Sequence, residues 1–287
     1  MIDELVARVW PGGVEAVEPL GGGITNRNFK VRAGGDTYVL RVGGKDTELL
    51  GIDRRVEHEA ALAAARLGIA PEVVAFVEPE GYLVTRFVEG VVGQAPLDAV
   101  VPLLRRLHES TPIAGRFDSF RVVEAYARTA REHGGRLPAE YGEAKRTADR
   151  IEALRGAVTP RPCHNDLLAA NFVLGDGRLW IVDWEYAAMG DPAFDLANFA
   201  ISNGLDEEGD RALLDAYGGA DARVHVLMRF MSDFREAMWG AVQQAVSALD
   251  FDFLSYTGEH LERLEATAES DRFRDAFDYV TQAQPSQ

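Results

Sequence analysis

The chain has 287 residues, 47% of them hydrophobic, which suits one large domain or two lobes that share a cleft. It carries 30 basic against 46 acidic residues, and the net charge of −16 disfavours nucleic acids and anionic membranes as partners. No apolar run reaches the ~18 residues of a membrane span, and the acidic N-terminus is unlike a signal peptide. The single cysteine, Cys163, excludes an intrachain disulfide. We therefore expect a cytoplasmic protein without membrane insertion, whose oligomeric state the sequence leaves open.

The first 89 residues are predicted to contain two helices and several strands. One helix is expected over residues 1–11, and a second from Asp53 to Leu67, with an acidic start and a stop at Gly68. Alternating apolar residues predict strands at 29–32, 37–42, 73–77 and 82–88. A glycine-rich segment precedes the first strand. Its glycines let backbone N–H groups turn toward a ligand, although such a run is most often only a hairpin turn.

Residues after Gly90 are predicted to be mainly helical. Leucines at helical spacing indicate a helix over 97–110, and one or two charged helices follow, with a break at Gly134 and Gly135. Beyond residue 190, the same reasoning predicts four further helices, at 192–202, 207–217, 222–249 and 251–268. The tail from Thr281 is polar, and we expect it to be frayed.

The most informative segment lies between these two parts. His164, Asp166 and Asn171 form the pattern H-x-D-x-x-x-x-N, and two short apolar runs about a Gly-Asp-Gly turn then predict a β-hairpin. Asn171 stands at the start of this hairpin and Asp183 at its end. Carboxylate and amide oxygens are ligands of magnesium, which keeps other positions for phosphate and water. The pattern therefore predicts a magnesium site with a neighbouring carboxylate.

Protein kinases place an Asp base, a metal-binding Asn and a second metal-binding Asp in the same order. A hairpin with acidic ends is common by itself, but the full set at this spacing is not. Residues 162–195 resemble the catalytic core of the aminoglycoside phosphotransferase and choline kinase superfamily. The resemblance implies an α+β, bilobal, protein-kinase-like fold, with a small antiparallel N-terminal lobe (1–89) and a larger, mainly helical C-terminal lobe (90–287). It also implies ATP and Mg²⁺ as cofactors.

The same resemblance assigns the nucleotide side of the site. Asp166 would be the base, with Asn171 and Asp183 as metal ligands. Arg41 would take the place of the phosphate-binding lysine, and its acidic partner would be Glu57 by the family's spacing or Glu59 by helical periodicity, of which we favour Glu57. The remaining nucleotide contacts would be a glycine-rich lid and the hinge between the lobes, namely Gly22, Gly23, Thr25, Asn26, Phe87 and Val88.

The acceptor side resembles choline and ethanolamine kinases in a D-W-E-Y run and a later W-G helix. A quaternary ammonium group cannot donate hydrogen bonds, so it is best held by aromatic faces with carboxylates nearby. The resemblance therefore implies Trp239, Tyr186, Glu185 and Tyr256 as substrate residues, beside Asp166. Aromatic residues at helical spacing are more often core, and we expect that role for Phe230, Phe234 and Met238.

We therefore predict a kinase that transfers the γ-phosphoryl group of ATP to the hydroxyl of choline or a similar small cationic alcohol. Within the same chemistry, ethanolamine, thiamine or an aminoglycoside are alternative acceptors. Outside it, a nucleotide-binding pseudokinase or a non-catalytic binding module for quaternary amines would use some of the same features. The intact trio of Asp166, Asn171 and Asp183 argues against a pseudokinase.

Overall fold

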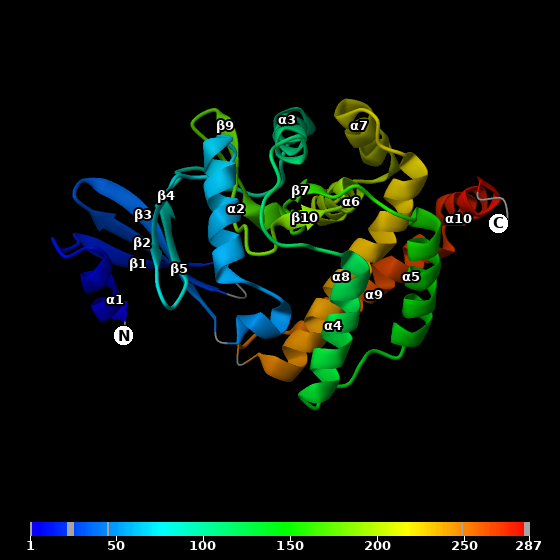
Figure 1. Ribbon diagram of the computed structural model, residues 1–287, viewed down its shortest axis with the longest axis horizontal. Coiled ribbons are helices and arrows are strands. Elements are labelled where there is room, and N and C mark those ends of the chain that lie inside the picture. Colours follow the sequence, from blue (N-terminus) through cyan, green and yellow to red (C-terminus); the bar gives the residue numbers. More distant parts are fainter. Residues whose placement is uncertain (1, 22–25, 45, 248, 284–287) are drawn as a thin grey trace.

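A computed structural model describes residues 2–21, 26–44, 46–247 and 249–283, and it shows a small sheet lobe beside a larger helical lobe (Figure 1). The sheet is antiparallel with the strand order β1-β2-β3-β5-β4. Its strands are β1 (Ala16–Leu20), β2 (Asn26–Ala33), β3 (Asp36–Gly43), β4 (Val73–Val77) and β5 (Tyr82–Arg86). The lobe also contains α1 (Ile2–Val9), the short helix η1 (Thr47–Leu50) and α2 (Arg54–Arg66). The predicted α+β, kinase-like fold is confirmed.

Turn chemistry and an apolar face explain how the sheet forms. Gly34 and Gly35 join β2 to β3 with φ of +63° and +84°, which is the two-residue turn that matches the twist of paired strands. The register then places Val31, Leu40 and Val84 on one face, where they form a buried cluster with residues of α1. This pairing places Arg41 of β3 at the side of the sheet that meets the other lobe.

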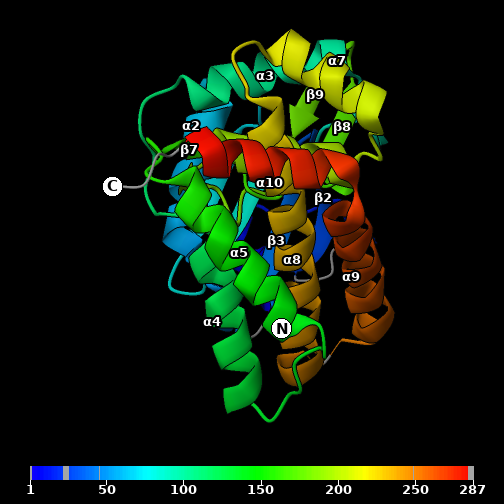
Figure 2. The ribbon, with the colours of Figure 1, turned by 90° about the vertical axis from the view of Figure 1, so that its right-hand side faces the viewer.

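The helical lobe is built around one long buried helix, α8 (Ala222–Val246). All its residues from 225 to 243 except Arg229 are buried, which is the pattern of a core helix that packs on every side. Helices α4 (Ser119–Glu132), α6 (Pro192–Ser202), α9 (Phe253–Glu269) and α10 (Asp271–Ala283) contact α8 around its circumference (Figure 2). The lobe is completed by α3 (Leu97–His108), α5 (Tyr141–Arg155) and α7 (Glu207–Tyr217).

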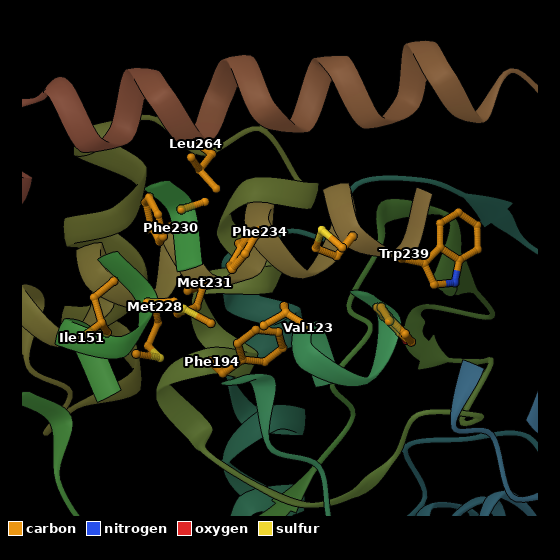
Figure 3. Packing of buried hydrophobic residues seen from close by; sticks show 14 of the residues in the cluster. Val123, Ile151, Phe194, Met228, Phe230, Met231, Phe234, Trp239 and Leu264 are labelled. Carbon is orange, nitrogen blue, oxygen red and sulfur yellow. The ribbon is translucent and has the colours of Figure 1, made fainter. Parts of the chain in front are cut away.

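Side chains of α8 and its neighbours make the larger hydrophobic core (Figure 3). Phe230 and Phe234 are buried there, as expected from their spacing. Trp239 lies at the other end of the same row of side chains. A second core cluster joins α2 and β5 of the sheet lobe to α3 and α6 of the helical lobe, so the two lobes share buried contacts. The boundary between residues 89 and 90 stays a prediction.

Short strands between the lobes carry the loop that contains Asp166. These are β6 (Val91–Val92), β7 (Arg161–Cys163), β8 (Phe172–Gly175), β9 (Arg178–Ile181) and β10 (Ala188–Gly190). The predicted hairpin is β8 and β9, with β6 paired to the outside of β8. Helices α6 and α7 match their predicted bounds, whereas α10 was not predicted. Among the described residues, none of the helices is both long and apolar enough to cross a bilayer.

Candidate active site

The loop from His164 to Asn171 is held in place by Asp195 of α6. Asp195, which is fully buried, accepts hydrogen bonds from the backbone N–H groups of His164 (2.9 Å) and Asn165 (2.6 Å). It also accepts one from Nε2 of His108 (2.9 Å). Asn165 adopts the left-handed region, with φ of +63°, which turns the chain between His164 and Asp166. The loop geometry therefore depends on a carboxylate about 30 residues further along the chain.

The loop and hairpin bring Asp166, Asn171 and Asp183 to one region. The side-chain amide of Asn171 donates to the backbone carbonyl of Asp166 (2.8 Å) and, at 3.4 Å, to its carboxylate. Burial raises the pKa of Asp166 to about 8, opposed by Arg235 and reinforced by the charges of Glu236 and Asp183. Asp183 follows β9 with φ of +65°. The carboxylates at 166 and 183 are thus close enough to influence one another.

Arg41 connects the sheet lobe to this region. Its guanidinium contacts Glu57 at 2.6 Å, Asp183 at 2.5 Å and Glu185 at 2.8 Å. Burial raises the pKa of Asp183 to about 7, with Arg41 acting in the opposite direction. Glu59 is exposed on α2, so the argument from helical periodicity was wrong and the family's spacing places the correct glutamate beside Arg41.

A second arginine, which the sequence did not reveal as a site residue, completes this network. Arg54 contacts Glu57 (2.7 Å) and Glu185 (3.1 Å), and it donates to the side chains of Asn26 (3.0 Å) and Thr47 (3.2 Å). Asn26 in turn donates to Glu185 at 2.9 Å. Arg54 stands three residues before Glu57 in the first turn of α2, a spacing that favours an ion pair and was the available signal.

A cavity of about 350 Å³ opens between the lobes beside these charges. Val39, Leu83, Phe87 and Val88 line it from the sheet lobe, and Asn171, Val173, Val182 and Asp183 line it from the helical lobe. Arg41 lies at its polar part. An apolar slot that ends in a cation and oxygen ligands suits a flat base joined to phosphates. Gly22, Gly23 and Thr25 lie outside the described residues, while Leu20 and Gly21 line the cavity.

The residues expected to bind the acceptor divide into two groups. Tyr186, Trp239 and Tyr256 lie together: the indole of Trp239 donates to the hydroxyl of Tyr186 (3.0 Å), and the rings of Trp239 and Tyr256 are 5.4 Å apart. Glu185 differs from the expectation, because its oxygen contacts Asn26, Arg41 and Arg54 on the nucleotide side.

Two charged residues of α8, which the sequence argument passed over, connect this aromatic group to Asp166. Arg235 is 1% exposed, and it donates to Asp166 (3.0 Å) and Glu236 (2.5 Å). Its guanidinium lies 4.4 Å from the centre of the Tyr186 ring. Glu236 accepts a hydrogen bond from Tyr256 at 2.8 Å. The sequence signal was a charged pair, Arg235 and Glu236, four and three residues before Trp239 in a mainly apolar stretch of the helix.

The donor set fits the expected metal. Asn171 and Asp183 supply an amide and a carboxylate oxygen on the same cavity wall, and oxygen ligands are what Mg²⁺ prefers. The carboxylate of Asp183 keeps 27% of its side-chain surface exposed, so it remains accessible from the cavity.

Comparison with known proteins places this site in a family. The family model described as "Phosphotransferase enzyme family" matches residues 16–232, a span that includes Arg41, Asp166, Asn171 and Asp183. The chain belongs to this phosphotransferase family. This membership agrees with the resemblance read from the sequence.

Individual relatives refine the placement. The chain is 30% identical to the protein LicA of Haemophilus influenzae over 71% of its own length and 63% of that protein, so it aligns with less than two thirds of this relative. Among solved structures, it is similar to a choline/ethanolamine kinase family protein from Mesorhizobium loti, with a TM-score of 0.82 and 30% identity over 98% of this chain and 99% of that one. Choline kinase LicA from Streptococcus pneumoniae has the same fold, with a TM-score of 0.80 and 23% identity over 92% and 98% of the two chains.

Proposed function

We propose that this protein transfers the γ-phosphoryl group of ATP to the hydroxyl of choline or a similar small amino alcohol. The observation that carries the proposal is the arrangement of Asp166 between two sets of residues. On one side lie Asn171, Asp183 and Arg41 beside the interlobe cavity, and on the other lie the aromatic residues of the acceptor group. The names of the relatives, LicA and choline/ethanolamine kinase family protein, support the same choice of acceptor.

The nucleotide would occupy the interlobe cavity. Phe87 and Val88 would face its base, and Arg41, held by Glu57, would face its phosphates. Asn171 and Asp183 would hold Mg²⁺, which when bound neutralises charge on the phosphates. The lid residues Gly22, Gly23, Thr25 and Asn26 are assigned to the phosphates by resemblance. The catalysis derived from these residues is positioning and charge neutralisation in a site of low dielectric.

Asp166 would accept or orient the proton of the acceptor hydroxyl. One of its oxygens accepts from Arg235 and the other lies 3.4 Å from Asn171, so the carboxylate is fixed on two sides. Its raised pKa suits a group that takes up a proton during the reaction. The substrate residues Tyr186, Trp239 and Tyr256 would line the part of the site that receives the acceptor's ammonium group. The proposal also places the protein in the cytoplasm, because ATP is available there.

A coupled ADP-release assay tests the proposal, with Mg²⁺, ATP and a panel of choline, ethanolamine, thiamine and aminoglycosides. We expect ADP release that depends on an amino alcohol and is abolished by Asp166→Ala.

Asp118→Ala is the matched control, because this aspartate caps α4 and lies outside the site. Activity with aminoglycosides alone would assign the chain to a different acceptor. Nucleotide binding without turnover on any acceptor would point instead to a pseudokinase.

A further inference from the structure

The aromatic group expected to hold the acceptor's cation already holds a cation of the protein. The guanidinium of Arg235 lies over the ring of Tyr186, with 4.4 Å between the guanidinium carbon and the ring centre. This is the geometry in which an aromatic face attracts a positive charge. We propose that Arg235 permanently occupies this position of the acceptor site, so that the site selects amino alcohols with a small, hydrogen-bonding ammonium group over trimethylated ones. The inference deepens the proposed function and rests on it.

Two buried carboxylates hold Arg235 in this position. Its side chain is 1% exposed, and the same nitrogen, Nη1, donates to both Asp166 (3.0 Å) and Glu236 (2.5 Å). Glu236 is fixed from the other side by the hydroxyl of Tyr256. Moving the guanidinium off Tyr186 would separate a buried charge from two buried carboxylates, which is strongly unfavourable. The acceptor therefore meets the site with Arg235 in place.

The occupied ring limits what remains for the acceptor. Trp239 and Tyr256 still have aromatic faces, but they meet each other edge to face at 5.4 Å, so they do not enclose a cation from opposite sides. The hydroxyl of Tyr186 already accepts a hydrogen bond from Trp239. A trimethylammonium group, which has no N–H donors and depends on surrounding faces, loses one wall to Arg235.

A primary ammonium group has other partners in the same place. It carries three N–H donors, and the carboxylate oxygens of Asp166 and Glu236 each have lone pairs beyond those already used. The two carboxylates share the single guanidinium of Arg235. Choline and protonated ethanolamine carry the same positive charge, so charge does not distinguish them. Hydrogen bonding favours the less methylated ammonium group.

The experiment compares kcat/KM for ethanolamine and for choline in the wild type, Arg235→Met and Arg235→Lys. Methionine keeps an unbranched apolar stem without the guanidinium and its charge, and it frees the Tyr186 face. We expect the ratio of kcat/KM for choline to kcat/KM for ethanolamine to rise by about tenfold or more in Arg235→Met. This is a change of the size that one methyl group produces in a pocket. Arg235→Lys keeps a cation, so its ratio should stay within about threefold of the wild type.

Arg229→Met is the matched control. Arg229 belongs to the same helix as Arg235, but it pairs with Asp210 and lies outside the acceptor group. Its ratio should equal that of the wild type. The inference is overturned if Arg235→Met slows both acceptors equally or lowers the ratio, since Arg235 would then act only on Asp166 or on folding. If no amino alcohol is phosphorylated by the wild type, the proposed function itself fails, which is a different result.

A measurement on the unchanged protein decides the matter if Arg235→Met does not fold. Methylammonium and tetramethylammonium are tested as competitors of ethanolamine at fixed Mg²⁺ and ATP. With the Tyr186 face taken, we expect methylammonium to compete better than tetramethylammonium. Stronger competition by tetramethylammonium would show an open aromatic cage and would overturn the inference.

Discussion

Arg41 and Asp183 are bound to each other: a guanidinium nitrogen of Arg41 lies 2.5 Å from a carboxylate oxygen of Asp183. One of these residues is proposed to face the phosphates and the other to hold the metal. Their contact joins the sheet lobe to the end of the hairpin across 142 residues of sequence. Asp183 is therefore paired with a cation of the protein, and the two lobes are connected at the place where the phosphates are expected.

This relationship predicts opposite effects of Asp183→Asn on activity and on stability. Activity should fall by about 10²–10³-fold or more, because a charged group at the reacting phosphates is lost. Stability should be unchanged or higher, since burial disfavours the ionised form of Asp183 and raises its pKa, while Arg41 keeps Glu57 and Glu185 as partners. Thermal unfolding together with ADP release checks both, and a melting temperature several degrees below the wild type would contradict the prediction.

Asp195→Asn should damage both stability and turnover. The carboxylate of Asp195 accepts hydrogen bonds from two backbone N–H groups of the loop and from His108. In Asp195→Asn, the side-chain NH₂ group would face at least one of these N–H donors in place of an acceptor oxygen. Loss of a fully used buried acceptor costs about 3 kcal/mol of unfolding free energy. Urea unfolding measures it. Asp191→Asn, at the N-cap of the same helix, should cost less than about 1 kcal/mol, because asparagine caps a helix about as well as aspartate and only a partly exposed ion pair with Arg155 is weakened, and kcat should be nearly unchanged. Equal losses for the two variants would argue against a special role for Asp195.

The pH dependence of stability should include a contribution from Asp210 of α7. Burial opposes ionisation of this carboxyl, but His225, Arg229 and Arg272 outweigh it and hold the pKa below its usual value. A carboxyl with a lowered folded pKa stabilises the fold above its unfolded pKa of about 3.9 and loses that contribution as the pH falls through the folded value.

The free energy of unfolding measured between about pH 5 and pH 2.5 tests this, because the window lies around and below the unfolded pKa. The wild type should lose stability more steeply than Asp210→Asn, whose amide does not titrate. Asp215→Asn, at an exposed position of the same helix, should follow the wild type. Parallel curves for the wild type and Asp210→Asn would show that the cluster does not contribute.

Local signals were sufficient for much of the fold. Helical periodicity predicted α6 with its observed bounds, and the Gly-Asp-Gly turn predicted the hairpin that separates Asn171 from Asp183. α10 was missed although Phe273, Ala276 and Phe277 have helical spacing and are buried. Helix α6 and the hairpin could be predicted because each depends on residues that are close together in the sequence.

The missed site residues depend on distant partners. Arg235 acquires its role from Asp166, 69 residues earlier in the chain, and Arg54 from Glu185, 131 residues later. In the sequence each is only a charged residue in a helix, a type that is normally exposed. Glu185 was misplaced for the same reason, because the position of its neighbours Trp184 and Tyr186 did not determine the direction of its own side chain.

Gly240→Ala should affect the acceptor selectively. A Cβ atom at Gly240 would lie 2.4 Å from the hydroxyl oxygen of Thr257 and 3.1 Å from the Tyr256 ring, so α9 can cross α8 at this point only because residue 240 is glycine. The methyl group should push α9 outward and carry Tyr256 away from Glu236 and Trp239. We expect KM for the amino alcohol to rise by about tenfold or more while KM for ATP stays the same, since Tyr256 would be displaced from the aromatic group proposed to hold the acceptor. Gly258→Ala, at a position of α9 where a Cβ meets open space, is the control and should change neither constant. A rise in KM for ATP of the same size would mean that the change distorts the whole site, and would contradict the assignment of Tyr256 to the acceptor side.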